Sequence, residues 1–220
     1  MIARRAFHLS AVATAAAGLL PALHAQAQQK PPQEGKDYVR LDKPAPVDTP
    51  PGRVEVIEFF WYSCPHCNAF EPQFDSWAKN APKDVAVRRM PIAFRPDFAP
   101  QQKLYFALES MGRLDDMHRR VFTAIHAERL PLATDAAIAA WVAKQGVDAA
   151  KFQEAYNSFS VATKVRRASQ LQDAYKVEGV PSLGIAGRWY TDGTMAGNLE
   201  RALQVANQLI AEARKAPART

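Results

Sequence analysis

The chain has 220 residues, of which 48% are hydrophobic, and both values suit a globular protein of one or two domains with a hydrophobic core. Its formal net charge is +6, but the lysines and arginines are scattered and partly matched by acidic residues. Because the sequence contains no basic block with interleaved aromatic residues, we expect no nucleic-acid partner. No apolar stretch beyond the first 27 residues is long enough to cross a bilayer.

Residues 1–27 have the pattern of a secretory signal peptide. Arg4 and Arg5 form a short basic region, residues 11–23 are small and apolar, and the last three residues read Ala-Gln-Ala. The apolar stretch is too short for a permanent membrane anchor, so we expect removal of the segment near Ala27 and export of the protein. Loss of the two arginines lowers the net charge from +6 to +4. The arginine pair leaves the general secretory and the twin-arginine route open.

The chain has two cysteines, Cys64 and Cys67, and they lie only three positions apart. A structural disulfide stabilises a fold mainly by restricting the unfolded chain, and this effect becomes smaller as the closed loop becomes shorter. A bond between these two cysteines restrains almost nothing. The pair is therefore expected to serve chemistry.

The first half of the chain predicts a βαβ unit. Residues 28–52 are rich in proline and are expected to be an extended lead-in with a short strand at 38–41. The β-branched and aromatic run at 54–60 suits a strand buried on both faces. A helical pattern that ends before Pro82 follows the cysteines, and a second strand is expected at 85–92. The cysteines then lie at the carboxyl end of the first strand, where open α/β sheets place their reaction sites.

Residues 96–172 have the pattern of helices throughout. Thr134 and Asp148 are expected to cap helix N-termini, and Gly146 to end a helix. Two sets of apolar side chains recur at i, i+4 and i+7 and are expected to face a core. They are Leu104, Leu108 and Met111, and Phe152, Tyr156 and Phe159.

Strand patterns return at 181–186 and 188–190, and a final amphipathic helix is expected at 198–213. A βαβ half and a ββα half thus flank a long helical block. This order predicts an α/β domain that carries an all-helical insertion.

A Cys-x-x-Cys pair at the start of a helix has a physical logic. The sulfur of Cys64 lies near unpaired backbone N–H groups at the positive end of the helix dipole, which favours the thiolate. Cys64 is then the exposed nucleophile, or the sulfur that a substrate thiolate attacks, and Cys67 resolves the mixed disulfide. Pro65 suits the first helical turn because its missing N–H has no partner there.

Three other roles are open to a pair of cysteines with this spacing. A c-type haem site requires histidine after the second cysteine, where this chain has Asn68. A zinc site needs about four ligands, and beyond the cysteines the mature chain offers only His66, His118 and His126. An inert surface disulfide is the third reading. Redox exchange is favoured over all of them.

Residues 58–67 read Glu-Phe-Phe-Trp-Tyr-Ser-Cys-Pro-His-Cys, which resembles the active-site stretch of the DsbA family of periplasmic thiol–disulfide oxidases. Residues 179–182, Gly-Val-Pro-Ser, resemble the cis-proline loop of that family. The resemblance implies a thioredoxin fold with an inserted all-helical domain. The implied boundaries are 28–95 and 173–220 for the two parts of the thioredoxin-like domain and 96–172 for the helical domain.

The resemblance also implies roles for single residues. Cys64 would be the nucleophile, Cys67 the resolving thiol, and His66, beside Pro65, the residue that stabilises the Cys64 thiolate and makes the disulfide strongly oxidising. The remaining implied residues lie outside the motif. Pro181 would follow a cis bond and lie against the disulfide, the Val180 backbone would pair with an extended substrate, Glu58 would be a buried acid, and Arg89 would stand where the family has its lysine partner.

Because arginine and lysine side chains are not interchangeable, the sequence does not determine whether Arg89 pairs with Glu58. Trp61 and Tyr62 also keep two interpretations, since they either line the substrate surface or pack inside.

The implied activity is that of a periplasmic thiol:disulfide oxidase. It would donate the Cys64–Cys67 disulfide to newly exported cysteine-containing proteins and be reoxidised by a quinone-linked membrane partner of the DsbB type. We expect a monomer without metal or organic cofactor. A disulfide isomerase or reductase of the same fold and a peptide-binding chaperone remain the alternatives.

Overall fold

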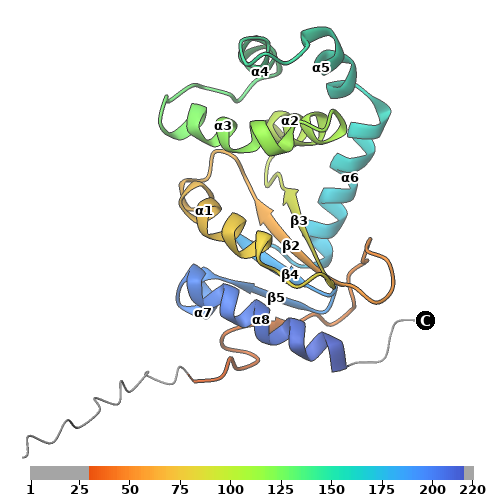
Figure 1. The fold of residues 1–220 in the computed structure, drawn as a ribbon, viewed down its shortest axis with the longest axis vertical. Coiled ribbons are helices and arrows are strands. Elements are labelled where there is room, and N and C mark those ends of the chain that lie inside the picture. Colours follow the sequence, from red (N-terminus) through yellow and green to blue (C-terminus); the bar gives the residue numbers. More distant parts are fainter. Residues whose placement is uncertain (1–29, 216–220) are drawn as a thin grey trace, which may run out of the picture. The chain divides into compact units, whose positions relative to one another are not determined.

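The strand expected at residues 54–60 is β2 (Val54–Phe60), and all seven of its residues are buried. It lies between β3 (Val85–Pro91), which is parallel to it, and β4 (Ser182–Ile185), which is antiparallel. With β1 (Val39–Arg40) and β5 (Trp189–Asp192), these strands form one sheet in the order β1-β5-β4-β2-β3 (Figure 1). This computed structural model describes residues 30–215, so the predicted signal peptide lies outside the described residues.

Two helices cover one face of the sheet. These are α1 (Pro65–Lys79) and α8 (Leu199–Lys215), which contact each other (Figure 1). Val56 of β2 belongs to the same buried cluster as Phe74 of α1 and the apolar side of α8. These helices exclude water from one face of β2, and other parts of the chain exclude it from the opposite face. This explains why the sequence of β2 is almost continuously apolar.

The opposite face of the sheet is covered from the end of α6 (Phe159–Ala174). Tyr175 follows this helix, and its ring centroid lies 5.2 Å from that of Phe59 on β2. A Cβ atom on Gly184 of β4 would lie 2.5 Å from the Tyr175 ring. Only glycine therefore lets the tyrosine ring lie this close to the strand.

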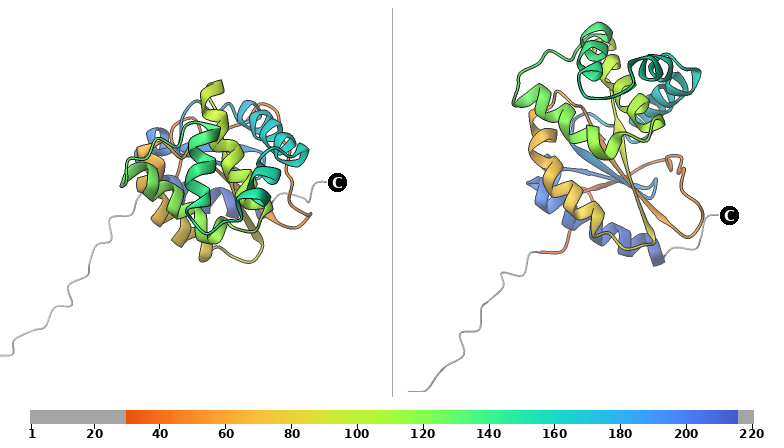
Figure 2. Two further views of the ribbon diagram at one scale, coloured as in Figure 1. Left: turned by 90° about the horizontal axis from the view of Figure 1, so that it is seen from above. Right: turned by 45° about the horizontal axis from the view of Figure 1, so that its top comes forward.

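The block predicted to be helical forms a layer beyond the carboxyl ends of β2 and β3, which Figures 1 and 2 show from three directions. Its elements are a 3-10 turn (Pro96–Phe98), α2 (Ala99–Ser110), α3 (Leu114–His126), α4 (Asp135–Ala143), α5 (Ala149–Tyr156) and α6. Thr134 and Asp148 accept hydrogen bonds from backbone N–H groups and cap α4 and α5, as predicted. The domain boundaries at 95 and 172 stay predictions.

The prediction of a core position for Phe159 is wrong. Phe152 and Tyr156 are buried, but the Phe159 side chain is 80% exposed. Ser158 caps a new helix by accepting the N–H of Val161, so Phe159 opens α6 and does not continue α5. The i, i+4, i+7 spacing spans two helices, and a shared face exists only within one.

A short helix that the sequence did not predict follows directly after β5. It is α7 (Gly193–Ala196), whose first N–H groups, of Thr194 and Met195, donate to the carboxylate of Asp192. The final helix extends to Lys215, two residues beyond the predicted end. Within the described part of the chain, no helix combines the length and apolarity needed to cross a membrane.

Candidate active site

Cys64 is the N-cap residue of α1. Its backbone is extended, Pro65 takes the first helical position, and the backbone N–H of Cys67 lies 3.5 Å from the Cys64 sulfur. A turn in which the Cys64 N–H donates to the Trp61 carbonyl at 3.0 Å connects β2 to this cap. The sulfur therefore lies at the positive end of the helix, as the sequence predicts.

This position lowers the pKa of Cys64 from 9.0 to about 6. The largest cause is a hydrogen bond from the Cys67 thiol, followed by the backbone N–H groups of Cys67 and His66; partial burial acts in the opposite direction. All the favourable contacts stabilise the thiolate relative to the thiol. At neutral pH Cys64 is thus mostly the nucleophilic form.

Cys67 has the opposite properties. Its side chain is fully buried, and burial, together with the neighbouring Cys64 sulfur, raises its pKa well above the usual range. A thiol of high pKa next to one of low pKa gives the pair an asymmetric chemistry: Cys64 leaves easily as a thiolate, whereas Cys67 takes up a proton when it is released.

The loop before β4 lies against the cysteine pair. The Cys64 sulfur lies 3.5 Å from the Val180 carbonyl oxygen, to which it donates a hydrogen bond in its thiol form, and the Val180–Pro181 peptide bond is cis, as the resemblance implies. Val180 is partly exposed and Pro181 buried. More than 110 residues separate this loop from the motif in sequence, and the antiparallel pairing of β4 with β2 brings them together.

His66 is exposed on the first turn of α1. Its electrostatic effect lowers the pKa of Cys64, but by less than the hydrogen bonds from the Cys67 thiol and the backbone N–H groups. Solvent screens an exposed charge, whereas the thiol and the backbone N–H groups contact the sulfur directly. The Cys67 thiol and the backbone N–H groups thus stabilise the thiolate more than His66 does, and the role of His66 stays a prediction.

Glu58 is the buried acid that the sequence predicts. Its side chain is 1% exposed, and burial, with the nearby negative charge of Glu71, raises its pKa well above the ordinary value. Residue pairing between β2 and β3 places Glu58 opposite Arg89. Arg89 Nε lies 3.4 Å from Glu58 Oε2, yet neither carboxylate oxygen of Glu58 has a hydrogen-bond partner among the described residues.

The guanidinium of Arg89 instead hydrogen-bonds Glu71, with 2.6 Å between Nη2 and Oε1. Glu71 is buried on α1. Burial disfavours its ionised form, but its contacts with His118 and Arg89 outweigh this and lower its pKa. Sequence reasoning missed this acid, although its position four residues after Cys67 places it on the inner face of the same helix.

A buried tyrosine–histidine pair extends this polar group toward the motif. Tyr62 Oη lies 2.8 Å from Nδ1 of His118 on α3, and His118 Nε2 lies 3.4 Å from Glu71 Oε2. Burial lowers the pKa of His118 and so favours its neutral ring, which shares a hydrogen bond with the Tyr62 hydroxyl at Nδ1. Tyr62 is therefore a packed residue, while Trp61 is half-buried and stacks on Phe98 with 3.8 Å between ring centroids.

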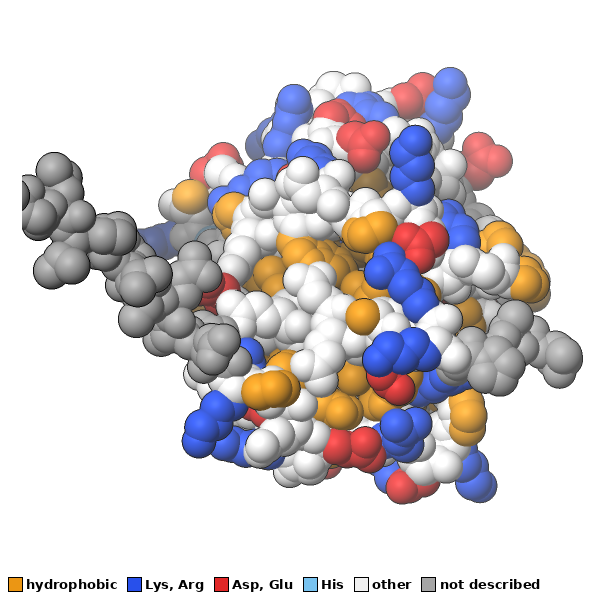
Figure 3. Space-filling view, turned by 60° about the horizontal axis from the view of Figure 1, so that its bottom comes forward, with side chains coloured by type: hydrophobic (Ala, Val, Ile, Leu, Met, Phe, Trp, Pro, Cys, Tyr) orange, Lys and Arg blue, Asp and Glu red, His pale blue; other side chains and the backbone are white. Residues whose placement is uncertain are grey.

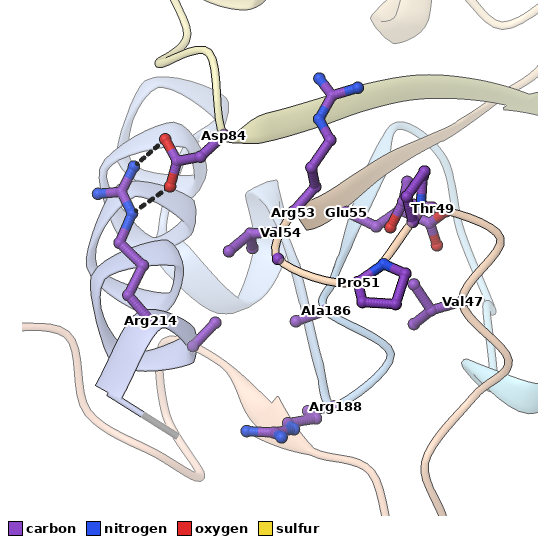
Figure 4. A pocket seen from close by; sticks show the side chains of 13 residues that line it. Val47, Thr49, Pro51, Arg53, Val54, Glu55, Asp84, Ala186, Arg188 and Arg214 are labelled. Carbon is purple, nitrogen blue, oxygen red and sulfur yellow. Dashed lines mark hydrogen bonds and ion pairs between the residues drawn. The ribbon is translucent and has the colours of Figure 1, made fainter. Parts of the chain in front are cut away.

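The described surface has a hollow of about 480 Å³ at the other end of the sheet (Figure 4). It is lined by Val54 at the start of β2, by Asp84 just before β3, and by Arg214, which forms a two-pronged ion pair with Asp84. The cysteines follow the carboxyl end of β2, so this hollow is not part of their site. On the face that Figure 3 shows, acidic and basic side chains are interspersed around small apolar areas.

A second hollow, of about 600 Å³, is lined by Glu71, Arg89 and His118 together with exposed charged residues. It brings solvent close to the buried acid Glu71. Among residues 30–215, no three histidine, cysteine or acidic side chains are grouped as ligands of a metal would be.

Comparison with known proteins shows the family to which the chain is similar. Residues 55–204 match the family of DSBA-like thioredoxin domains. The thiol:disulfide interchange protein DsbA of Bordetella parapertussis is 47% identical over 209 residues, covering 94% of this chain and 96% of the relative, and that of Pseudomonas aeruginosa is 42% identical over 182 residues, covering 83% and 86%.

Solved structures agree. The crystal structure of Pseudomonas aeruginosa DsbA matches with a TM-score of 0.78 at 42% identity, covering 82% of this chain and 94% of that one. The oxidoreductase DsbA of Xylella fastidiosa matches with a TM-score of 0.76 at 27% identity, covering 84% and 99%.

Proposed function

Because this chain belongs to the family of DSBA-like thioredoxin domains, we propose that it is a thiol:disulfide oxidase that donates its Cys64–Cys67 disulfide to exported cysteine-containing proteins. The observation that carries the proposal is the position of the Cys64 sulfur at the N-terminus of α1, with a pKa lowered to about 6. A low-pKa thiolate is a good leaving group, which favours release of oxidised substrate.

The reaction has two exchange steps. A substrate thiolate attacks Cys64 Sγ, the Cys64–Cys67 bond breaks, and Cys67 leaves and takes up a proton. A second substrate thiolate then attacks the substrate sulfur of the mixed disulfide, and Cys64 leaves as a thiolate. The substrate loses two electrons and gains a disulfide, while the protein ends with a Cys64 thiolate and a Cys67 thiol.

Several groups around the sulfurs suit these steps. The raised pKa of Cys67 keeps it protonated after release, which slows its attack as the resolving thiol and gives the second substrate thiolate time to react. The partly exposed Val180 backbone next to Cys64 supports pairing with an extended substrate segment. His66 adds to thiolate stabilisation, and the Arg89–Glu71 ion pair, with the carboxyl of Glu58 beside it, forms a buried polar group.

We further propose that the protein acts in the periplasm as a monomer after removal of the signal peptide near Ala27. A quinone-linked membrane oxidase of the DsbB type would restore the disulfide by accepting the two electrons. The redox-active pair itself supplies all the chemistry of substrate oxidation, without metal or organic cofactor and without nucleic acid as partner.

The test is the equilibrium potential of the Cys64–Cys67 pair in a glutathione buffer. We expect a value above about −200 mV, whereas a value near that of thioredoxin, about −270 mV, would overturn the oxidase assignment and favour a reductase or isomerase. The variant Cys67→Ala, loaded with an aromatic thiol on Cys64, should exchange that thiol for a substrate that carries a single cysteine and form a stable mixed disulfide with it. A double variant with both cysteines replaced by serine should lose all substrate refolding activity, and retained rescue would favour a chaperone.

A further inference from the structure

The residues between β2 and Cys64 are held by side chains from the helical layer. The carbonyl of Tyr62 accepts a hydrogen bond from Nε2 of His126, at the end of α3, at 2.8 Å. Ser63, the residue directly before Cys64, is held by Gln101 of α2. Both anchors come from segments far along the chain, and neither side chain touches a cysteine sulfur in any contact that the structure gives.

Both the oxygen and the nitrogen of the Gln101 side-chain amide form hydrogen bonds that hold Ser63. Gln101 is 3% exposed; its Oε1 accepts from the Ser63 N–H at 3.2 Å, and its Nε2 donates to Ser63 Oγ at 2.7 Å and to the Leu132 carbonyl at 2.9 Å. The orientation of the amide is determined by its partners, since a backbone N–H only donates and a carbonyl only accepts. One side chain thus joins α2, the loop after α3, and the residue before the nucleophile.

The position of Cys64 depends on this loop. Its sulfur lies 3.5 Å both from the Cys67 backbone nitrogen and from the Val180 oxygen, and contacts of this length are sensitive to small displacements. The Ser63 peptide leads directly into the cap, so release of Ser63 weakens the contact of the Cys64 sulfur with the Cys67 N–H, which stabilises the thiolate.

We propose that Gln101 is a positioning residue for the redox reaction, which holds the Cys64 sulfur in its cap at α1 by fixing Ser63. This rests on the proposed function in one respect, that Cys64 is the reacting sulfur. The helical layer then has a direct part in the chemistry, because it determines how well the first sulfur is stabilised as a thiolate.

The chain offers a matched control in the next residue. Gln102 is also buried, at 2% exposure, and its Nε2 also donates to a backbone carbonyl at 2.9 Å, that of Pro91 at the end of β3. It makes no hydrogen bond with residues 61–64 among those that the structure gives. The variants Gln101→Met and Gln102→Met remove similar buried amides from the same helix, and only the first releases Ser63.

The experiment measures alkylation of Cys64 by a neutral reagent in the reduced full-length protein, at pH values below its pKa, where the rate follows the thiolate fraction. We expect about threefold slower alkylation for Gln101→Met, which corresponds to about half a pKa unit, and no change for Gln102→Met. The equilibrium with glutathione should shift toward the disulfide by a similar factor in the first variant only. Equal effects of the two variants, or no effect of Gln101→Met, would overturn the proposal.

The variant Ser63→Ala keeps the test decisive if Gln101→Met does not fold. It removes only the hydroxyl contact, and we expect a smaller slowing in the same direction; an unchanged rate would then count against the proposal. The potential of the wild-type pair tests the proposed function separately. A wild-type protein that is a poor oxidant while Gln101→Met still slows alkylation would remove the proposed function and leave the positioning role intact.

Discussion

Glu58 and Arg89 lie opposite each other on the parallel strands β2 and β3, yet the arginine hydrogen-bonds Glu71 of α1 and not its neighbour in the sheet. The distance of 3.4 Å between Arg89 Nε and Glu58 Oε2 keeps an electrostatic attraction, but burial and the charge of Glu71 raise the pKa of Glu58. The three side chains therefore divide into an ionised Arg89–Glu71 pair and a carboxyl that tends to keep its proton.

Glu58→Gln should change how the stability of the oxidised protein depends on pH. Above pH 4.5, the ordinary pKa, the unfolded state releases the Glu58 proton while the folded state retains it, so the unfolding free energy falls as pH rises toward the folded-state pKa. The slope from this group is at most about 1.4 kcal/mol per pH unit. Urea denaturation of both proteins between pH 4 and 8 isolates Glu58, because all other groups titrate in both; a constant difference would contradict the raised pKa.

Glu71→Gln should destabilise the protein by about 2 kcal/mol, since it takes the charge from a buried hydrogen bond with Arg89. It should also lower the pKa of Glu58, which the charge of Glu71 raises. Asp75→Asn is the matched control: Asp75 lies 3.5 Å from the same guanidinium but is 41% exposed, and it should lose less than about 1 kcal/mol. Equal losses in denaturant titrations would show that burial of the pair does not matter.

The Cys64 titration should respond more to Cys67→Ala than to His66→Ala. The hydrogen bond from the Cys67 thiol is the largest cause of the lowered pKa and the electrostatic effect of His66 is smaller, so both variants should raise the pKa from about 6, the first by more. The pH dependence of alkylation in the reduced proteins measures this, and Cys64→Ser gives the background. His66→Ala should also make the redox potential more negative. An unchanged titration in that variant would exclude the role of His66.

Gly184→Ala should reduce the unfolding free energy by about 1–3 kcal/mol, the usual range for overpacking a core. The added Cβ would lie 2.5 Å from the Tyr175 ring, which is held by Phe59 and by a hydrogen bond from the Gly187 N–H to its hydroxyl. Gly179→Ala, where a Cβ meets nothing within 4 Å, is the control for a change of glycine in the same segment. Equal denaturation midpoints for the two variants would contradict this prediction. They would show that the Tyr175 ring can move aside for the added Cβ atom without loss of stability.

The sequence predicted the parts of the site that are local. The run at 54–60, the proline after Cys64 and the cap residues Thr134 and Asp148 each favour one backbone conformation through contacts within a few residues. Their positions in the structure agree with the predictions. Where a pattern crossed an unrecognised cap, as at Ser158, the prediction for Phe159 was wrong.

The sequence by itself predicted that two cysteines three residues apart begin a helix at the carboxyl end of a buried strand, and its resemblance to a family implied that a distant Val-Pro segment belongs to the same site. Only the tertiary structure decided which side chains surround them: that Glu71 takes the hydrogen bond of Arg89, that His118 meets Tyr62, and that Gln101 holds Ser63. Periodicity shows which face of a helix is buried, but it does not show which residue of another element lies opposite. That depends on how the helices pack over the sheet, and the pKa of Cys64, through its cap, depends on the same packing.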